Sequence, residues 1–199
     1  MPKPLATATS PSWDQLYELA EAQSGYFSTQ QAQTAGFSTH LLHHHIAAGR
    51  VTRARRGIYR LVHFPPAPHE DLVVHWLWSG TAGAFSHETA LVLHQLSDAL
   101  PAGVHMTVPS VWKPRRLRVP RGLILHFEAL TENEQTWSGP VPITNVRRTL
   151  IDCAASAVSP ELVQQGLVDA QRRGLLAPRD ITRIQRNLHP ARSKNRRRA

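Results

Sequence analysis

The side chains best suited to chemistry form one basic cluster near the N-terminus. Five arginines fall within residues 50–60, and no acidic residue lies among them: Arg50, Arg53, Arg55, Arg56 and Arg60. A solvent-exposed turn more often mixes lysine, glutamate, asparagine and glycine. Guanidinium groups bind phosphate oxygens through paired hydrogen bonds. The cluster therefore predicts contact with a nucleic-acid backbone.

Two short helices are predicted immediately before this cluster. Ser28 or Thr29 can cap the first helix by accepting a hydrogen bond from its free backbone N–H groups. Ala32 and Ala35 are small enough to let a second helix cross closely. Gly36 supplies the turn between the two helices, because glycine adopts backbone conformations that other residues avoid.

The second helix is predicted to run from a cap at Ser38 to Gly49, where a left-handed C-cap is expected. Leu42 and Ile46 are four residues apart and therefore share its inner face. Residues 51–61 then read as two strand-like pieces around a basic turn. Helix, turn, helix and hairpin in this order is the pattern of a winged helix–turn–helix, whose second helix lies in the DNA major groove.

The outer face of the second helix carries the side chains that would meet DNA. Thr39 and His40, near its N-terminus, are best placed to reach base edges, and His43 and His44 can donate to bases or phosphates. The arginines would supply most of the affinity and the helix the selectivity. The predicted DNA-binding residues are Ser28, Thr29, Ser38, Thr39, His40, His43, His44, Arg50, Arg53, Arg55 and Arg56.

The histidine run also suggests a metal site, but the sequence argues against one there. His40 and His44 have the spacing that lets two imidazoles share a metal ion. No cysteine or carboxylate lies beside them, and neighbouring arginines disfavour a cation. We therefore predict no metal and no cofactor. The remaining histidines are scattered and are interpreted as ordinary surface or core residues: His63, His69, His75, His87, His94, His105 and His126.

Catalytic motifs are incomplete, so the chain is predicted not to be an enzyme. Residues 105–107 have the His-x-Thr form of two-histidine phosphoesterases, but residues 126–128 do not supply the required second copy. Ser86 has no glycine frame, and Cys153 lies in an apolar helix. A nuclease would need an acid–x–lysine pair on a strand, and the few lysines do not provide it.

Composition points to a globular, basic protein. The chain has 199 residues, 41% of them hydrophobic, with 23 Lys+Arg against 14 Asp+Glu and a formal net charge of +9. Such a charge attracts polyanions. A single cysteine fits a reducing compartment. No apolar run is long enough for a membrane span, and the first ten residues lack the features of a secretory signal. We expect a bacterial cytoplasmic protein.

The chain is predicted to be α+β, with a winged helix–turn–helix followed by a mixed α/β domain that has a small central sheet and C-terminal helices. The predicted segments are a disordered lead (1–11), the winged domain (12–63), a proline-rich linker (64–70), the second domain (71–190) and a basic disordered tail (191–199). In the second domain, helices are expected at 69–79, 86–96, 145–156, 159–173 and 178–188, and strands at 104–108, 117–119 and 123–127.

Three further features of the second half have alternative interpretations. A second basic group reads as a charged edge strand, or else as another anionic contact: Lys113, Arg115, Arg116, Arg118 and Arg121. The tail at 192–198 is either a solubilising end or an arm that seeks phosphate. Arg148 and Asp152 could form an ordinary i,i+4 ion pair. The roles of Thr149 and of Ser86 with His87 stay open.

Four motifs, in this order, resemble those of the AbiEi-type antitoxins of bacterial type IV toxin–antitoxin (abortive infection) systems. Residues 36–49 resemble the helix pair of that family, and Arg56–Arg60 matches its Arg-Gly-Val-Tyr-Arg wing. Phe85–Leu91 followed by His105–Pro109 is similar to its Ser-His-x-(Ser/Thr)-Ala-Leu helix and His-(Leu/Val)-Thr-Val-Pro strand. Residues 143–152 resemble its Val-Thr…Arg-Thr-Leu-x-Asp helix start.

The resemblance implies a DNA-binding autorepressor that recognises inverted repeats in its own promoter. It also implies a C-terminal domain that counteracts a cognate nucleotidyltransferase-like toxin, with direct contact an open question. The operator would be read by Thr39, His40, His43 and His44, with Arg53, Arg55 and Arg56 on its backbone. The chain would be a monomer or weak dimer in solution, paired on DNA. The alternatives are a DNA- or RNA-binding regulator or interaction module that is not an antitoxin and, less favoured, a nuclease.

Overall fold

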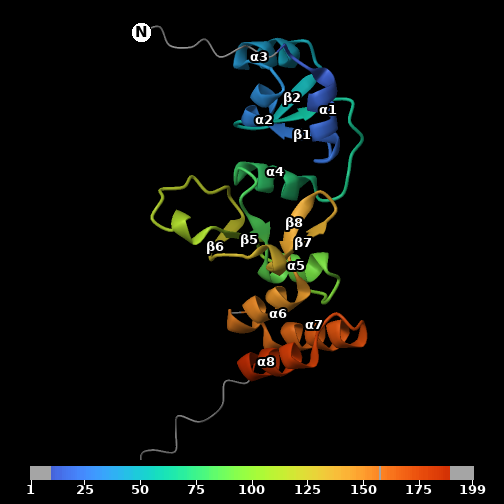
Figure 1. Cartoon of the computed structure of the whole chain (residues 1–199), viewed down its shortest axis with the longest axis vertical. Coiled ribbons are helices and arrows are strands. Elements are labelled where there is room, and N and C mark those ends of the chain that lie inside the picture. The colour runs from blue at the N-terminus through green and yellow to red at the C-terminus, as the bar shows by residue number, and fades with distance from the viewer. Residues whose placement is uncertain (1–9, 157, 189–199) are drawn as a thin grey trace, which may run out of the picture. The chain divides into compact units, whose positions relative to one another are not determined.

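The computed structural model describes residues 10–156 and 158–188 of the chain. Contacts divide it into two compact units, Met1–Thr81 and Ala82–Ala199, shown in Figure 1. The predicted basic tail and nearly all of the predicted N-terminal lead lie outside the described residues. The two units are considered separately below.

The first unit has the element order of a winged helix–turn–helix. Its elements are α1 (Trp13–Glu21), β1 (Tyr26–Ser28), α2 (Thr29–Thr34), α3 (Thr39–Ala47), β2 (Val51–Arg55), β3 (Ile58–Leu61) and α4 (Glu70–Trp78). The three strands form an antiparallel sheet in the order β1-β3-β2. Helices followed by a β-hairpin confirm the predicted fold class for this part of the chain.

Serine caps define where the first three helices begin. Ser12, Ser28 and Ser38 each accept a hydrogen bond from the backbone N–H three residues later. At Ser28 the cap is reciprocal, because the Gln31 side chain accepts from the Ser28 backbone N–H. Gly36 has φ +85°, which opens the turn between α2 and α3 as predicted.

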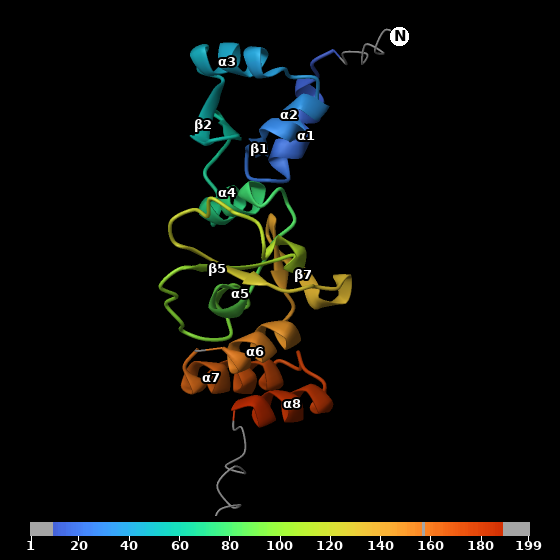
Figure 2. The same ribbon diagram turned by 90° about the vertical axis from the view of Figure 1, so that its left-hand side faces the viewer.

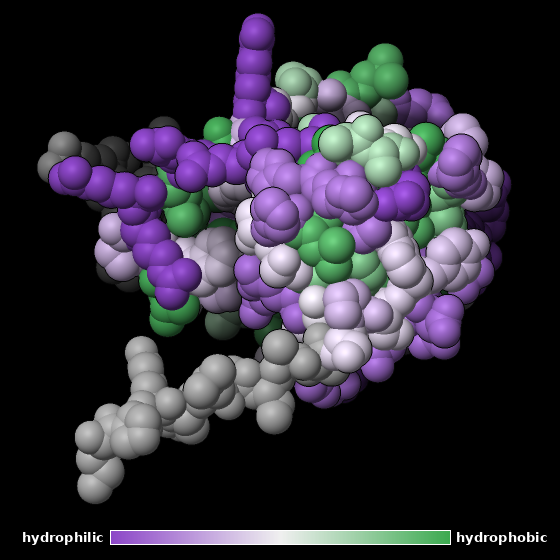
Figure 3. Space-filling view, turned by 90° about the horizontal axis from the view of Figure 1, so that it is seen from above, coloured by the Kyte–Doolittle hydropathy of each residue, from purple (hydrophilic) through white to green (hydrophobic). Residues whose placement is uncertain are grey.

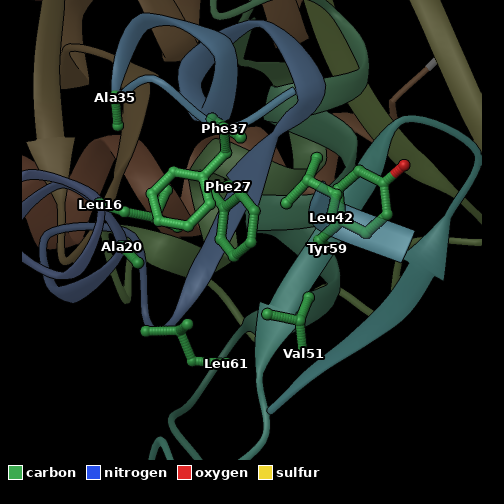
Figure 4. Packing of buried hydrophobic residues seen from close by; sticks show 10 residues of the cluster. Leu16, Ala20, Phe27, Ala35, Phe37, Leu42, Val51, Tyr59 and Leu61 are labelled. Carbon is green, nitrogen blue, oxygen red and sulfur yellow. The ribbon is translucent and has the colours of Figure 1, made fainter. Parts of the chain in front are cut away.

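One face of the sheet, which we call the helix face, packs against α1, α2 and α3. Phe27, Val51 and Tyr59 lie on this face, and the Phe27 and Tyr59 rings stack at 5.8 Å. Figure 4 shows Phe27 and Phe37 in the middle of the cluster. The full set of buried members is Leu16, Ala20, Phe27, Ala32, Ala35, Phe37, Leu42, Val51, Tyr59 and Leu61.

The opposite face of the sheet, which we call the α4 face, carries Tyr26, Ile58 and Arg60. Glu70 at the start of α4 accepts hydrogen bonds from the Tyr26 hydroxyl at 2.7 Å and from the Arg60 guanidinium at 3.0 Å. Because α4 packs here, the first unit continues to Thr81. We expected the boundary in the proline-rich segment 64–70, but that segment connects two parts of the same unit.

The second unit is built on a mixed five-stranded sheet. Its strands are β4 (Ala84–Phe85), β5 (Val104–Val108), β6 (Leu123–Phe127), β7 (Gln135–Ser138) and β8 (Val141–Thr144), in the order β6-β5-β4-β8-β7. β5 runs parallel to β6, and β4 runs parallel to β8. Two short 3₁₀ helices, η1 (Ser110–Trp112) and η2 (Glu132–Glu134), lie between strands.

The strand predicted at 117–119 is absent, and with it the charged edge strand. These residues belong to the connection between β5 and β6, where prolines at 114 and 120 flank them. Proline offers no backbone N–H for a ladder, so the flanking prolines disfavour pairing of this segment with the sheet. The basic residues of this region, Lys113 to Arg121, therefore lie on a loop.

Four helices complete the second unit: α5 (His87–Leu93), α6 (Val146–Ala155), α7 (Pro160–Arg172) and α8 (Pro178–Leu188). Figures 1 and 2 both show α6, α7 and α8 gathered on one side of the sheet. Their buried faces meet α5 in one cluster around Leu91, Leu150 and Leu167, and Cys153 is buried in it. Among the described residues, no helix is long and apolar enough to cross a membrane.

Candidate nucleic-acid interface

The outer face of α3 is an exposed row of polar side chains. Thr39, His40, His43 and His44 are all exposed, whereas Leu42 is fully buried. The separation follows from the helical repeat, since residues three and four apart share a face. Figure 3 shows the first unit from the side on which α3 lies in Figure 1, and the surface in view is mostly hydrophilic, with small hydrophobic patches.

The third histidine of the run, His45, points inward. Its ring packs edge-on against Trp13 at 4.7 Å and Phe37 at 5.7 Å. Burial lowers the pKa of His45, and the charge of Arg50 lowers it further. A neutral imidazole can accept a hydrogen bond, and the Arg50 Nε donates one to His45 Nδ1 at 2.9 Å. This contact holds the stem of the exposed Arg50 at the C-terminal end of α3.

A β-bulge sends two arginines of the hairpin to opposite faces of the sheet. Arg53 pairs with Tyr59, and paired residues of antiparallel strands lie on the same face, so Arg53 is on the helix face. The register then shifts, and Arg55 pairs with Ile58 on the α4 face. Without the bulge, the two-residue period of a strand would have put both arginines on one side.

The surroundings of Arg55 agree with this assignment. Arg55 is partly buried, and it lies close enough to His75 of α4 to affect its titration. Burial lowers the pKa of His75, and the charge of Arg55 lowers it further. Arg55 thus lies apart from Arg53, with which the sequence grouped it. Arg56 is exposed in the turn, beside Gly57 with φ +77°.

Ser28 and Thr29, both predicted to bind DNA, are engaged in the fold. The Ser28 hydroxyl caps α2. The Thr29 backbone N–H and hydroxyl both donate to the carbonyl oxygen of Gly57, at 2.9 and 3.3 Å. The start of α2 is thereby tied to the turn of the hairpin. Ser38 caps α3 in the same way and is exposed.

The second unit contains a partly buried charge network that the sequence only partly indicated. The Arg148 Nε donates to the Asp152 carboxylate at 2.7 Å, which is the predicted i,i+4 pair. The same guanidinium also contacts Glu134 and Glu128. Burial raises the pKa of Asp152 to about 6, although the Arg148 charge opposes the shift. Arg148 thus joins α6 to the carboxylates that follow β6 and precede β7.

Comparison with known proteins gives matches to a family model and to solved structures. The family model described as transcriptional regulator, AbiEi antitoxin matches residues 14–62. The RV2827C protein from Mycobacterium tuberculosis, known from a crystal structure, is 14% identical to this chain and matches with a TM-score of 0.48. That match covers 85% of this chain and 69% of the other. No curated protein matches. Residues 14–62, which include the α3 face and the arginine hairpin, thus resemble the AbiEi antitoxin transcriptional regulators.

Proposed function

We propose that the chain binds double-stranded promoter DNA through α3 and the arginines beside it, and that it represses its own operon in the bacterial cytoplasm. The observation that carries the proposal is the exposed polar face of α3 within a regulator domain of this family. A helix presented in this way can enter the major groove, because its other face is anchored in the core.

Base recognition is assigned to the N-terminal half of α3. Thr39 and His40 lie in its first turn, and His43 and His44 follow one turn later. Hydroxyl and imidazole groups can donate to and accept from base edges, so this face can discriminate between sequences. We assign selectivity to these four residues.

Phosphate contact is assigned to the arginines that accompany α3. Arg50 is held by His45 at the end of the helix, Arg53 shares the helix face of the sheet, and Arg56 is exposed at the hairpin turn. Arg55, on the α4 face, is left out of this set. It serves as a matched control, since it has the same side chain two positions away on the same strand.

The DNA part of the proposal is tested by fluorescence anisotropy with two duplexes of equal length. One carries the region upstream of this gene, and the other carries the same bases in scrambled order. We expect tighter binding to the first duplex and a salt dependence of about 0.9 logarithmic units per neutralised phosphate. Arg53→Ala should reduce that slope by about 1, and Arg55→Ala should leave it unchanged.

Each alternative outcome removes a defined part of the proposal. Equal effects of the two arginine replacements would contradict the assigned interface. Equal affinity for both duplexes would contradict the recognition of a specific operator sequence. Binding whose affinity does not change with salt concentration would contradict DNA as the partner. Replacing Thr39 and His40 by alanine should abolish the preference for the upstream duplex while keeping the slope, because base contacts specify and phosphate contacts position.

The antitoxin part of the proposal is supported by the family match alone. We propose that two copies pair on inverted repeats and that the chain counteracts a nucleotidyltransferase-like toxin encoded beside it. Inducing that neighbouring gene in a bacterial host should arrest growth, and co-expression of this chain should restore it. Persisting arrest in the presence of the expressed chain would reject the antitoxin part and leave the DNA-binding part standing.

A further inference from the structure

Three histidines of the second unit, far apart in the sequence, meet in space. His87 is the first residue of α5, His105 lies on β5 and His126 lies on β6. One ring nitrogen from each lies within 4.8 Å of those of the other two. The parallel register pairs Thr107 with His126, so His105 and His126 occupy the same face of the sheet, two positions apart.

The three rings are in direct contact with one another. His105 Nδ1 and His126 Nε2 are 3.0 Å apart, and the His87 ring stacks on the His126 ring with 3.5 Å between centroids. His87 has φ +52°, in the left-handed region that favours glycine. Residues other than glycine keep such a conformation only where their surroundings hold them, and it is common at functional sites. The fold therefore maintains this arrangement against a local cost.

Polar contacts on the outer side of the cluster favour one tautomer for two of the rings. His105 Nε2 lies 3.3 Å from a Glu88 carboxylate oxygen, which favours the tautomer with the proton on Nε2 and a lone pair on Nδ1. His87 Nδ1 lies 3.0 Å from the Ser86 hydroxyl oxygen. With Nδ1 as the donor there, its Nε2 is free to act as a ligand. Histidines that bind metals usually donate their second N–H to an outer partner of this kind.

The chemical state of the rings suits a metal ion as well. Burial lowers the pKa of all three histidines, and for His87, where the neighbouring His126, His105 and Arg148 act in the same direction, it falls to about 3. The rings are therefore neutral, which is the form that coordinates metals. His87 is buried, whereas His105 and His126 are only partly buried, so a small ion can reach the cluster.

We propose that His87, His105 and His126 bind one divalent transition-metal ion, with zinc as the best fit and a fourth position left for water. Zinc–nitrogen distances of 2.0–2.1 Å put the nitrogens of a tetrahedral site about 3.3 Å apart. The pair at 3.0 Å is already close to that spacing, whereas the His87 ring, now stacked on the His126 ring, must tilt out of the stack to direct its nitrogen at the same ion. This site is independent of α3 and of the proposed DNA binding.

The test uses the untagged full chain, stripped with a chelator and then titrated with zinc by calorimetry. We expect one zinc per chain and a higher melting temperature in its presence. Cobalt should give the visible absorption of a tetrahedral site, and zinc should displace it. His126→Gln should lose stoichiometric binding. Glu88→Gln, which keeps all three imidazoles, should weaken zinc binding about 10- to 100-fold. The matched control is the double replacement His40→Gln and His44→Gln on α3, which should bind as the unmodified chain does.

Several outcomes would overturn the proposal. One is an unmodified chain that takes up no zinc at micromolar concentration, which would leave the cluster as a hydrogen-bonded core feature. Another is stoichiometric binding retained by His126→Gln, and a third is binding lost in the α3 control. Circular dichroism shows whether each variant folds. If His126→Gln does not fold, the cobalt spectrum of the unmodified chain and the Glu88→Gln titration decide the matter.

Discussion

The two units use histidine in opposite ways. On α3, His40, His43 and His44 follow one another closely in the sequence, and all are exposed. In the second unit, the cluster of His87, His105 and His126 is assembled from one helix and two strands, with ring nitrogens 3.0 Å apart at the closest. The side chains of the first set are exposed and can contact an external partner, whereas the rings of the second set mainly contact one another.

The contrast shows that closeness along the chain is a poor guide to a binding site for a small ion. Neighbouring residues on a helix surface diverge, because their side chains radiate from the axis. Residues on adjacent strands converge, because their Cα atoms lie about 5 Å apart. A run of histidines therefore suits a large, flat partner such as a nucleic acid, and a convergent set suits an ion.

The largest expected effect lies in the interior of the second unit. Arg148→Ala should lower the free energy of unfolding by about 3–5 kcal/mol, because it leaves Asp152 buried without its partner. The matched surface change, Arg53→Ala, should cost less than about 0.5 kcal/mol. Urea unfolding followed by circular dichroism measures both. A loss below about 1 kcal/mol for Arg148→Ala would show that the network contributes no more to stability than an exposed ion pair does.

A smaller effect should separate the inward histidine of α3 from its outward neighbour. His45→Ala removes ring contacts with Trp13 and Phe37 and the acceptor for Arg50, so we expect a loss of about 1–3 kcal/mol. His44→Ala should cost less than about 0.5 kcal/mol. Thermal melting of the two variants side by side makes the comparison. Similar melting temperatures would mean that the α3 histidines do not divide into two classes.

Acid should weaken the folded state through partly buried histidines such as His94. Burial lowers the pKa of His94, and the Arg173 charge lowers it further, against the raising effect of its 2.8 Å hydrogen bond to the Thr144 carbonyl. Below about pH 6.5 the unfolded chain therefore binds the proton more readily, and stability falls as pH falls.

The measurement is the urea midpoint between pH 7.5 and pH 5, in the presence of a chelator. His94→Gln should show a smaller decrease than the unmodified chain, because one partly buried imidazole no longer titrates. His43→Gln, a change on the exposed side of α3, should reproduce the decrease of the unmodified chain. A His94→Gln variant with an undiminished decrease would show that this histidine does not contribute.

The smallest expected effect concerns the tie between α2 and the hairpin turn. Thr29→Val removes the hydroxyl that donates to Gly57 O at 3.3 Å but keeps the backbone bond, so a loss of about 0.5–1 kcal/mol is expected. Thr34→Val, at an exposed threonine whose hydroxyl bonds only within its own helix, should be close to neutral. Thermal melting distinguishes them, and equal values would show that the tie adds nothing to stability.

Local patterns in the sequence predicted the α3 region well, because capping and helical periodicity act over a few residues. Ser38, Gly36 and Leu42 have the structural roles expected of them. The inward orientation of His45 is not predictable in the same way. The helical spacing that predicts a buried Leu42 is also compatible with an exposed imidazole at position 45. The separation of Arg53 from Arg55 depends on a β-bulge, and no residue type in the strand indicates that a bulge occurs there.

The second unit was predictable in its longer elements and not in its site. β5 and β6 follow the expected ranges, whereas β4 and β7 are too short to show an alternating pattern. The meeting of His105 with His126 depends on the parallel pairing of their strands across a long loop. That register cannot be read from the sequence alone. Nothing in the sequence therefore indicates that these histidines meet in space.

The packing of α4 on the sheet has a practical consequence for anyone who wishes to isolate the segment that the family model matches. The family match ends at residue 62, before α4 begins. A truncation there would uncover Tyr26 and Ile58, whose exposed fractions are 7% and 2%, and would leave Arg60 without its carboxylate. Apolar strand residues that are exposed to water in this way promote aggregation. A soluble, self-sufficient fragment that contains α3 and the arginine hairpin should therefore extend to Thr81.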